Sequence, residues 1–292
     1  MENCKLLYAK DTATSIKRKI KEYTDTLYGN KPCLAIVSVG NNPASASYMK
    51  GKIKDCDECG FDHMHVSLSE NTSKDMIKNT LKGLSNNANV HGIILQLPLP
   101  EKFKTTDVEE LIQYIDPKKD VDCFTNENIG KLFHGNNMNL TPCTPSGIIE
   151  LLKENNIDIK GKDVCIVGRS DIVGKPLSMM MTHMGATVTL CHTDTIRIEE
   201  KMKMADILVL AVGKAEFINN DNVDRCIKRG SIVIDVGINR NEEGKLVGDC
   251  DTEAASRFAS AITPVPGGIG LMTRAALMHN VLVGYRNQIL EK

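Results

Sequence analysis

The chain contains 292 residues, of which 41% are hydrophobic and 25% are charged, and its 36 lysines and arginines nearly balance 37 aspartates and glutamates. A formal net charge of −1 argues against binding to nucleic acid or to an anionic membrane, and the absence of tryptophan with only 4% aromatic residues argues against base stacking. The composition excludes disordered and fibrous classes, and the length suffices for two domains of roughly 150 residues each.

The amino-terminal residues and the cysteines bear on location. The start, MENCKLLYAK, lacks the long apolar segment of a signal peptide, and no apolar run reaches the roughly 20 residues of a membrane helix. The ten cysteines are scattered rather than densely spaced, which favours reduced thiols. Cys56 and Cys59 have CxxC spacing but no second cysteine or histidine pair, so we predict no metal site. We expect a cytoplasmic enzyme.

Strands and helices alternate in the first half of the chain. The expected strands are 33–40, 63–68 and 91–97, and the expected helices are 43–58, 73–88 and 106–114. Asn42 is the predicted N-cap of the first helix, with Pro43 at its first position, and Thr72 and Asp75 have capping-box spacing at the second. This alternation predicts an α/β domain with parallel strands.

The pattern restarts after TPCTPSG (141–147), where a helix leads into the next strand. Strands are expected at 161–168, 186–191, 206–213, 231–237 and 259–263, and further helices at 174–184, 196–204 and 271–290. This predicts a second α/β domain, a Rossmann-type doubly wound sheet that binds its ligand at the carboxyl ends of the strands. We assign 1–142 and 271–292 to one domain and 143–270 to the other, because the glycines and prolines of 264–270 can return the chain to the first.

A glycine-containing turn follows the first strand of the second domain. Gly168 ends that strand and Gly174 opens a helix, which is where a dinucleotide pyrophosphate would meet helix N–H groups; a purely structural turn is the alternative. The turn is not a P-loop, because Pro176 stands where Ser or Thr would hold Mg²⁺, and it is not a strict GxGxxG.

The end of the following strand indicates which dinucleotide is bound. It carries no carboxylate for a ribose 2′-hydroxyl, whereas Arg169 in the first turn can meet a 2′-phosphate. We therefore favour NADP over NAD, although Asp194 stands only a little further along the chain. We interpret His192 as a solvated loop residue rather than a catalytic one.

A second group of polar residues lies in the first domain. Tyr48 and Lys52 are four residues apart on one face of a predicted helix, and Gln96 ends a strand. Asp120 and Asp122 alternate with a hydrophobic residue, which predicts two carboxylates on one side. A phenol, an amine, an amide and a carboxylate converging between the domains would form a small-molecule site. The alternatives are a solvated lysine on an amphipathic helix and a surface cap at Asp122.

Seven motifs in order resemble the bifunctional methylenetetrahydrofolate dehydrogenase/cyclohydrolase family, from about residue 5 to 290. They are VGNNPASASYMKGKIKDCDECG (39–60), HGIILQLPLP (91–100), KDVD (119–122), TPCTPSG (141–147), VGRSDIVGKP (167–176), GDC (248–250) and ITPVPGGIG (262–270). The chain departs from the family pattern at Cys123, where glycine is usual, at Leu271, where proline is usual, and at Thr193, where serine is usual. A backbone at Cys123 that requires a positive φ would strain the turn holding Asp122.

The resemblance implies roles for particular residues. Lys52 would be the central group of the cyclohydrolase step, tuned by Gln96, with Tyr48 orienting the folate and Asp122 holding the pterin ring. Further folate contacts would come from Pro266, Gly267 and Gly268. Residues at the cofactor would be Thr144, Gly168, Arg169, Ser170, Thr193 and Ile238.

The resemblance also implies a reaction. The chain would oxidise 5,10-methylenetetrahydrofolate with NADP⁺, hydrolyse the methenyl product to 10-formyltetrahydrofolate, and form a homodimer through its cofactor domain. A dehydrogenase with weakened cyclohydrolase activity and a non-enzymatic nucleotide-binding regulator are the alternatives. Short-chain dehydrogenases also combine Y-x-x-x-K with a dinucleotide turn, but there the turn comes first, whereas here Tyr48 precedes Gly168.

Overall fold

The structure is a computed structural model that describes residues 4–135 and 139–290, with only the backbone described for 43–47. The described part of the chain divides into two compact units. Unit 1 takes its residues from 1–13 and 144–273, and unit 2 from 14–143 and 274–292. The prediction of two α/β domains with parallel sheets is confirmed.

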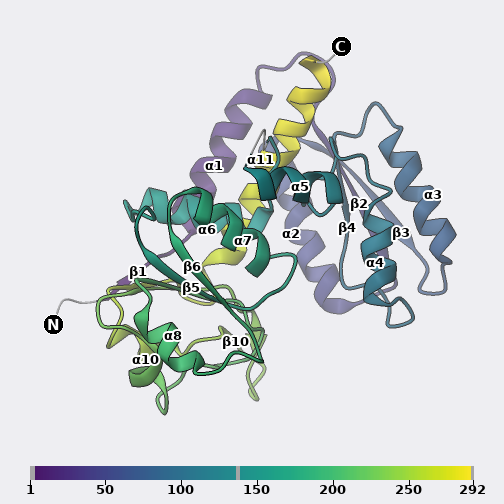
Figure 1. Cartoon of the computed structure of the whole chain (residues 1–292). Coiled ribbons are helices and arrows are strands. Elements are labelled where there is room, and N and C mark those ends of the chain that lie inside the picture. Colours follow the sequence, from purple (N-terminus) through teal and green to yellow (C-terminus); the bar gives the residue numbers. More distant parts are fainter. Residues whose placement is uncertain (1–3, 136–138, 291–292) are drawn as a thin grey trace. The chain divides into compact units, whose positions relative to one another are not determined.

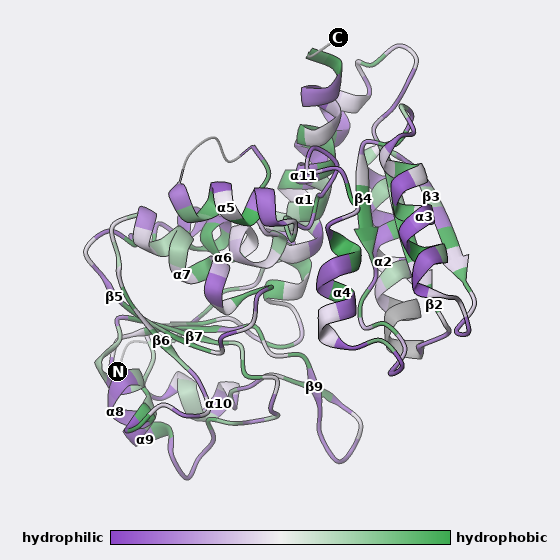
Figure 2. Cartoon of the chain, turned by 45° about the vertical axis from the view of Figure 1, so that its right-hand side comes forward, coloured by the Kyte–Doolittle hydropathy of each residue, from purple (hydrophilic) through white to green (hydrophobic). Residues whose placement is uncertain are grey.

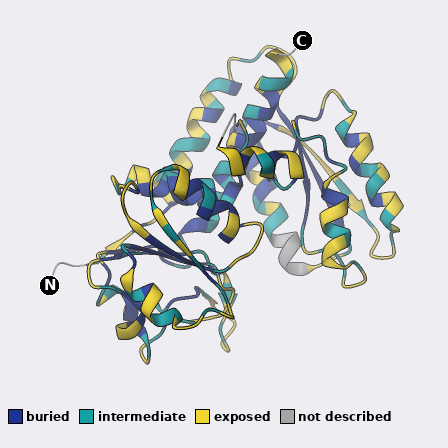
Figure 3. Cartoon of the chain, in the orientation of Figure 1, coloured by how far each residue is buried: buried dark blue, intermediate teal, exposed yellow. Residues whose placement is uncertain are grey.

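Unit 2 contains a three-stranded parallel sheet in the order β3-β2-β4. Its strands are β2 (Cys33–Val39), β3 (Asp62–Leu68) and β4 (Gly92–Leu95), and its helices are α1 (Lys10–Thr24), α2 (Pro43–Cys59), α3 (Lys74–Ser85), α4 (Thr105–Ile112), α5 (Asn126–His134) and most of α11 (Ile269–Leu290). Every residue of the central strand β2 is buried, whereas the edge strand β3 is largely exposed (Figure 3). Because β4 pairs with β2 in parallel, the carboxyl ends of these two strands lie side by side.

Helices cover both faces of this sheet (Figures 1 and 2). Leu34 and Ile36 of β2 pack in one cluster with residues of α1, α2 and α11. The alternate residues Ala35 and Val37 pack in a second cluster with α3 and α4. The period of two along a strand thus builds two cores from one strand, and α2 is fixed on the first of them.

In unit 2, capping differs from the prediction at α3, and two helices were not predicted. Ser73, not Thr72, is the N-cap of α3, since its side chain accepts a hydrogen bond from the Met76 amide. The sequence analysis did not identify α1 or α5. The signals for α5 were present, because Thr125 caps its start and Gly135, with a φ of 69°, ends it.

Unit 1 contains a six-stranded parallel sheet in the order β1-β11-β8-β7-β5-β6. Its strands are β1 (Lys5–Leu6), β5 (Asp163–Val167), β6 (Thr187–Cys191), β7 (Ile207–Leu210), β8 (Ile232–Asp235) and β11 (Ala261–Ile262), and its helices are α6 (Cys143–Glu154), α7 (Gly174–His183), α8 (Ile198–Met204), α9 (Val223–Cys226) and α10 (Thr252–Ser256). The chain runs from β5 to β6 on one side and then to β7 on the other. The order of strands reverses there, which is where doubly wound sheets bind ligands.

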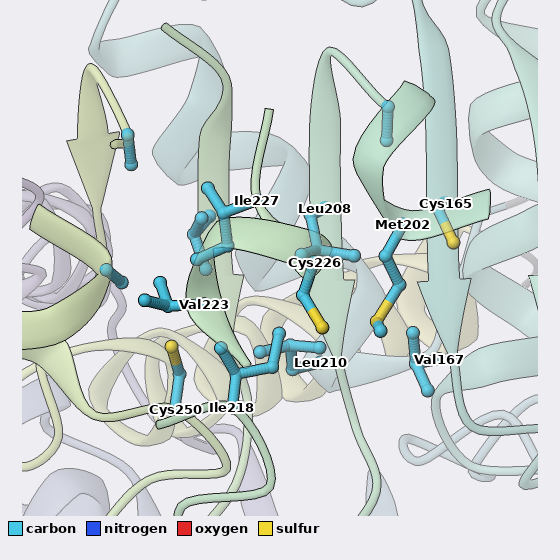
Figure 4. Close-up of a cluster of buried hydrophobic side chains, with 14 of the residues drawn as sticks. Cys165, Val167, Met202, Leu208, Leu210, Ile218, Val223, Cys226, Ile227 and Cys250 are labelled. Carbon is cyan, nitrogen blue, oxygen red and sulfur yellow. The ribbon is translucent and has the colours of Figure 1, made fainter. Parts of the chain in front are cut away.

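A hydrophobic cluster fills one face of this sheet (Figure 4). Val167, Leu208 and Leu210 of the strands pack with Met202 of α8 and Val223 of α9. Figure 1 shows α6 and α7 on the opposite face. Loops follow the strands at their carboxyl ends.

Two features of unit 1 differ from the expected organisation. The strand β1 pairs with β11, so residues 4–13 lie in unit 1, although we had assigned them with 1–142 to the other domain. The strand predicted at 206–213 ends at Leu210, because the amides of Val212 and Gly213 leave the sheet and donate to Asp249. A short antiparallel pair, β9 (Asn239–Arg240) and β10 (Leu246–Val247), lies between β8 and α10.

All ten cysteines are free, and nine of them are buried. Among the helices that the structure describes, none has the length and apolar character needed to cross a membrane.

Candidate functional site

The centre of the candidate site in unit 2 is a buried amine–amide pair. Lys52 lies on α2, its side chain is only 6% exposed, and its Nζ donates to Gln96 Oε1 at 3.0 Å. Gln96 follows β4, its backbone N–H donates to Val37 O, and its Nε2 donates to Leu97 O at 2.7 Å. Because the amide N–H₂ is engaged with Leu97, the carbonyl oxygen of Gln96 is directed at Lys52.

Tyr48 lies one helical turn before Lys52. The Lys52 Nζ is 5.1 Å from the centroid of the Tyr48 ring, which is a cation–π distance when the amine is protonated. Burial raises the pKa of the Tyr48 hydroxyl above its ordinary value, and the charge of Asp122 adds to this effect. The phenol is therefore neutral and able to donate a hydrogen bond throughout the physiological pH range.

Charge balance in the site depends on Lys52 and Asp122. Burial lowers the pKa of Lys52, and the nearby Asp122 carboxylate opposes that shift. Burial raises the pKa of Asp122, and Lys52 opposes it. Each group thus moves toward its neutral form through desolvation while the other holds it charged, which is the behaviour of proton-transfer sites.

The two aspartates of KDVD have different partners. Asp120 Oδ2 accepts hydrogen bonds from the backbone and hydroxyl of Thr125, both at 2.8 Å, and from Asn128 Nδ2 at 2.9 Å. Asp120 therefore holds the start of α5. Asp122 is the aspartate whose charge raises the pKa of Lys52 against the effect of burial.

The sequence analysis missed Cys143 and Asn280 at this site. The thiol of Cys143 donates to Val121 O at 3.3 Å and to Asp122 Oδ1 at 3.6 Å. Asn280, on α11, donates to Val121 O at 2.8 Å and to Thr141 O at 2.7 Å, and so ties the Asp122 segment to the segment before α6. A cysteine between two prolines in PCTP was the available signal for Cys143; nothing in the sequence links Asn280 to Asp122.

The departure at Cys123 has a structural consequence. Cys123 has a φ of 61° and is buried, so a non-glycine residue occupies the left-handed region directly after Asp122. The turn that holds Asp122 is therefore strained, as expected for a residue other than glycine at this position, because L-residues with a side chain disfavour that region by about 1–2 kcal/mol.

An ion cluster supports α2 behind Lys52. The carboxylate of Asp55 is fully buried and accepts from Arg274 Nη2 at 2.8 Å and from Lys17 Nζ at 2.9 Å. A Cβ on Gly51 would lie 2.7 Å from Arg274 Nη1, so the glycine makes room for the guanidinium against the helix. The cluster joins α1, α2 and α11 one turn beyond Lys52.

The predicted dinucleotide turn is found in unit 1. Gly168 follows β5 with a φ of 127°, and a Cβ there would lie 2.2 Å from Ala211 O. A Cβ on Gly174 at the start of α7 would lie only 1.7 Å from Gly168 O. Both positions admit only glycine, so the turn packs tightly on the end of the sheet and leaves the N-terminus of α7 close to it.

Side chains around the turn are exposed. Arg169 Nη2 donates to Asp194 Oδ2 at 3.0 Å, and both side chains are more than half exposed. Asp194 also lies 3.4 Å from His192 Nδ1. Thr193 is exposed beside them, and the exposed Ser170 accepts from the Val173 amide at 3.2 Å. These groups fit an anionic ligand at the carboxyl ends of β5 and β6.

The other predicted residues of unit 1 lie on its loops. Ile238 follows β8 and is 59% exposed. Thr144 Oγ1 lies 3.0 Å from Thr273 Oγ1. Gly267, in the turn after Pro266, has a φ of 113°, and a Cβ on Gly268 would lie 2.6 Å from Pro264 O.

The sequence matches one known protein family over most of its length. Residues 7–122 match the tetrahydrofolate dehydrogenase/cyclohydrolase catalytic domain, and residues 142–289 match the NAD(P)-binding domain of the same family. The bifunctional protein FolD of Acetivibrio thermocellus is 49% identical over 280 residues, which are 95% of each chain.

Solved structures agree. The bifunctional FolD methylenetetrahydrofolate dehydrogenase/cyclohydrolase of Campylobacter jejuni has a TM-score of 0.92 at 40% identity, covering 97% of this chain and 99% of its own. The Trypanosoma brucei enzyme, solved with NADP and an inhibitor, has a TM-score of 0.92 at 31% identity over 99% of both chains. By these matches over nearly its whole length, the chain belongs to the tetrahydrofolate dehydrogenase/cyclohydrolase family.

Proposed function

We propose that Lys52, Gln96, Tyr48 and Asp122 carry the folate chemistry of a bifunctional NADP-dependent enzyme. The enzyme oxidises 5,10-methylenetetrahydrofolate to 5,10-methenyltetrahydrofolate and hydrolyses this product to 10-formyltetrahydrofolate. The observation that carries the assignment of residues is the buried Lys52–Gln96 hydrogen bond of 3.0 Å. Desolvating a lysine amine costs free energy, and perturbed buried amines that face another polar side chain are concentrated at functional sites.

The unit 1 turn fits the dinucleotide. Its glycines let the backbone approach closely, the N-terminus of α7 favours a negative pyrophosphate, and Arg169 offers a guanidinium to a 2′-phosphate. We propose that Gly168, Arg169, Ser170 and Thr193 meet the phosphates. Thr144 and Ile238 are the remaining proposed contacts. Bound NADP⁺ accepts the hydride that leaves the methylene carbon.

Lys52 has a defined task in the hydrolysis. Water adds through its oxygen to the methenyl carbon while the neutral amine of Lys52 takes a proton from it. The bond from that carbon to N5 then breaks as N5 receives a proton from the lysine ammonium. The added hydroxyl loses its own proton to solvent as it becomes the carbonyl oxygen, and the formyl group stays on N10. Burial lowers the pKa of Lys52, which increases the neutral fraction that can act as the base.

The other side chains orient the groups that react. Gln96 accepts one N–H of Lys52 and so fixes the direction of the amine. We propose that Asp122 accepts hydrogen bonds from the pterin ring and that Tyr48 packs on the folate. Pro266, Gly267 and Gly268 are proposed as further folate contacts. Orientation alone can contribute several kcal/mol to each step.

A coupled assay tests the proposed function. The protein is mixed with 5,10-methylenetetrahydrofolate and either NADP⁺ or NAD⁺, and methenyl absorbance and reduced cofactor are followed separately from 10-formyl product. We expect reduction of NADP⁺, slower reduction of NAD⁺, and conversion of added methenyl substrate without any cofactor. No turnover with either cofactor would overturn the proposal, and turnover without hydrolysis would assign a weakened cyclohydrolase to the strained Cys123 turn.

We also propose that the protein is a homodimer located in the cytoplasm. Among the strands that the structure describes, β6 pairs with β5 only and so lies at an edge of the unit 1 sheet. Such an edge can pair across a two-fold axis in a homodimer. Sedimentation of a two-chain species would support this, and a single-chain mass would contradict it. Ten free thiols are consistent with a reducing compartment, and we propose the cytoplasm.

A further inference from the structure

A carboxylate outside the described site holds the loop that follows β7. Asp249 is fully buried, and its carboxylate accepts hydrogen bonds from the backbone amides of Val212 at 2.6 Å, Gly213 at 3.1 Å and Lys214 at 2.9 Å. It also accepts from Asn239 Nδ2 at 2.9 Å. One side chain thus fixes three consecutive amides of one loop and joins them to the segment after β8.

A second buried carboxylate holds Asp249 in turn. Asp235, the last residue of β8, accepts from the amides of Gly237 at 2.9 Å, Asp249 at 3.0 Å and Cys250 at 2.8 Å. A Cβ on Gly237 would lie 2.3 Å from Asp249 Oδ1, and a Cβ on Gly248 would lie 1.9 Å from Asp235 Oδ2. Glycine at both positions lets the two carboxylates reach the backbone. We call Asp235 and Asp249 the carboxylate clasp.

The clasp lies at the place where the sheet binds its ligand. The loop that Asp249 holds follows β7, and the glycine turn follows β5, the neighbouring strand on which the strand order reverses. The two loops touch, since a Cβ on Gly168 would lie 2.2 Å from Ala211 O. Val212 and Ile238, on the two segments joined by Asp249, are apolar side chains that remain 36% and 59% exposed.

Exposed apolar side chains on rigid loops suit a flat heterocycle better than a solvated surface. Three N–H groups directed at one carboxylate leave the loop little freedom, so the free protein already holds these side chains in place. Such preorganisation lowers the entropic cost of binding.

We propose that Asp249 is a positioning residue for the dinucleotide, acting through the loop after β7 and the segment carrying Ile238. The inference rests on the proposed function, because it takes NADP⁺ as the ligand of unit 1. It adds to that function a residue that contacts neither substrate nor reacting atoms. Its removal weakens NADP⁺ binding and leaves the folate-side chemistry of unit 2 intact.

The test compares two aspartates of the same unit. Asp249→Asn replaces an oxygen acceptor with an N–H₂ group that faces backbone donors, whereas Asp251→Asn changes a nearby aspartate that caps α10 and keeps a capping side chain. Asp249 is the better target than Asp235, because burial raises the pKa of Asp235 to about 7 and its charge then varies within the assay range.

Binding is measured by calorimetry with NADP⁺, and hydrolysis of methenyl substrate is measured without cofactor. We expect the Kd for NADP⁺ to rise at least tenfold in Asp249→Asn, with the KM for NADP⁺ rising more than kcat falls. Hydrolysis stays within twofold of the unsubstituted protein, and Asp251→Asn behaves like that protein in both assays.

A second, milder variant distinguishes a specific loss of NADP⁺ binding from misfolding of Asp249→Asn. Asn239→Ala removes one donor to Asp249 and leaves the carboxylate in place, and we expect a twofold to fivefold rise in the Kd for NADP⁺. If Asp249→Asn loses hydrolysis as well, the result for Asn239→Ala decides. If Asp249→Asn keeps its hydrolysis, an unchanged Kd for NADP⁺ in that variant overturns the inference. If it loses hydrolysis, an unchanged Kd for NADP⁺ in Asn239→Ala overturns the inference. Failure of the unsubstituted protein to bind NADP⁺ would instead overturn the proposed function, and the inference with it.

Discussion

The two units present polar groups to their ligands by different means. In unit 2 the proposed reacting group is a side chain, the buried Lys52 amine; burial lowers its pKa, and Asp122 opposes that shift. In unit 1 we propose that the ligand meets backbone, since Gly168 and Gly174 bring loops together within distances that no Cβ permits. The proposed chemistry of unit 2 therefore depends on the side chain at position 52. The turn of unit 1 depends instead on the absence of a side chain at positions 168 and 174.

The largest effect is expected from adding a methyl group to the unit 1 turn. In Gly174→Ala the new Cβ would lie 1.7 Å from Gly168 O, so the turn must open. We expect the NADP⁺-dependent rate to fall by about a thousandfold, or about 4 kcal/mol, with hydrolysis retained. Gly130→Ala is the control, because a Cβ there meets open space on α5. Normal oxidation by Gly174→Ala would contradict the backbone account of unit 1.

The next effect concerns the support of α2 in unit 2. Asp55→Ala leaves the partly buried Arg274 without its carboxylate, and we expect the free energy of unfolding to fall by about 3 kcal/mol. Denaturant titration measures this. Glu22→Ala, which removes the partner of exposed Arg18, is the control and should change stability by less than about 0.5 kcal/mol. Equal losses of unfolding free energy in Asp55→Ala and Glu22→Ala would contradict the claim that burial makes the Asp55–Arg274 pair the more stabilising one.

The Asp55 contribution also has a defined pH dependence. Although burial opposes it, hydrogen bonds from Arg274 and Lys17 hold the pKa of Asp55 below its ordinary value of 3.8. The stabilisation is therefore complete above the unfolded-state pKa and is lost as the pH falls through the folded-state pKa. The difference in unfolding free energy between the unsubstituted protein and Asp55→Asn should shrink only in that acidic range.

A smaller change tests the electrostatics of Lys52. Burial lowers the pKa of Lys52 and the charge of Asp122 opposes that shift, so Asp122→Asn should lower the pKa further. The pH dependence of Lys52 acylation, read by peptide mass spectrometry, measures the shift toward easier deprotonation. Asp57→Asn, an exposed position on the same helix, should leave it unchanged. A Lys52 pKa that stays the same or rises in Asp122→Asn would contradict the coupling.

The smallest effect is expected at the exposed pair of unit 1. Asp194 engages Arg169, and a 2′-phosphate bound by that guanidinium would displace it. Asp194→Asn should therefore lower the Kd for NADP⁺ by about twofold to fivefold, the range of an exposed ion pair. Calorimetry with both cofactors measures this, with Glu200→Gln as the control for an exposed carboxylate. Weaker NAD⁺ binding with unchanged NADP⁺ binding would instead place Asp194 at a ribose hydroxyl.

The same difference between the units explains what could be predicted from sequence. Lys52, Gln96 and the glycines of the turn belong to local patterns, a helical spacing of four or the end of a strand, and their positions follow from the α/β alternation. Arg274 and Asp55 are 219 residues apart in the chain, and Asn280 reaches Thr141 over 139 residues. No periodicity or motif specifies such contacts, because they arise from packing of elements already formed.

The carboxylate clasp shows this limit most clearly. Asp249 stands in the short motif GDC, yet its partners at 212–214 lie 35–37 residues earlier, and the first two of them were predicted as strand. The hydrophobic run continued to Gly213, so the pattern predicted a longer β7. The strand ends at Leu210 because a distant carboxylate takes the next amides.

The most direct measurement is the cofactor-free hydrolysis of 5,10-methenyltetrahydrofolate by Lys52→Met beside Lys50→Met. Both substitutions remove a lysine amine from α2, but Lys52 is buried at Gln96 and Lys50 is exposed. We predict that Lys52→Met loses at least about a hundredfold in rate, as expected for a proton-transfer group, while folate binding stays within threefold and Lys50→Met hydrolyses normally. Normal hydrolysis by Lys52→Met would contradict the assignment of Lys52.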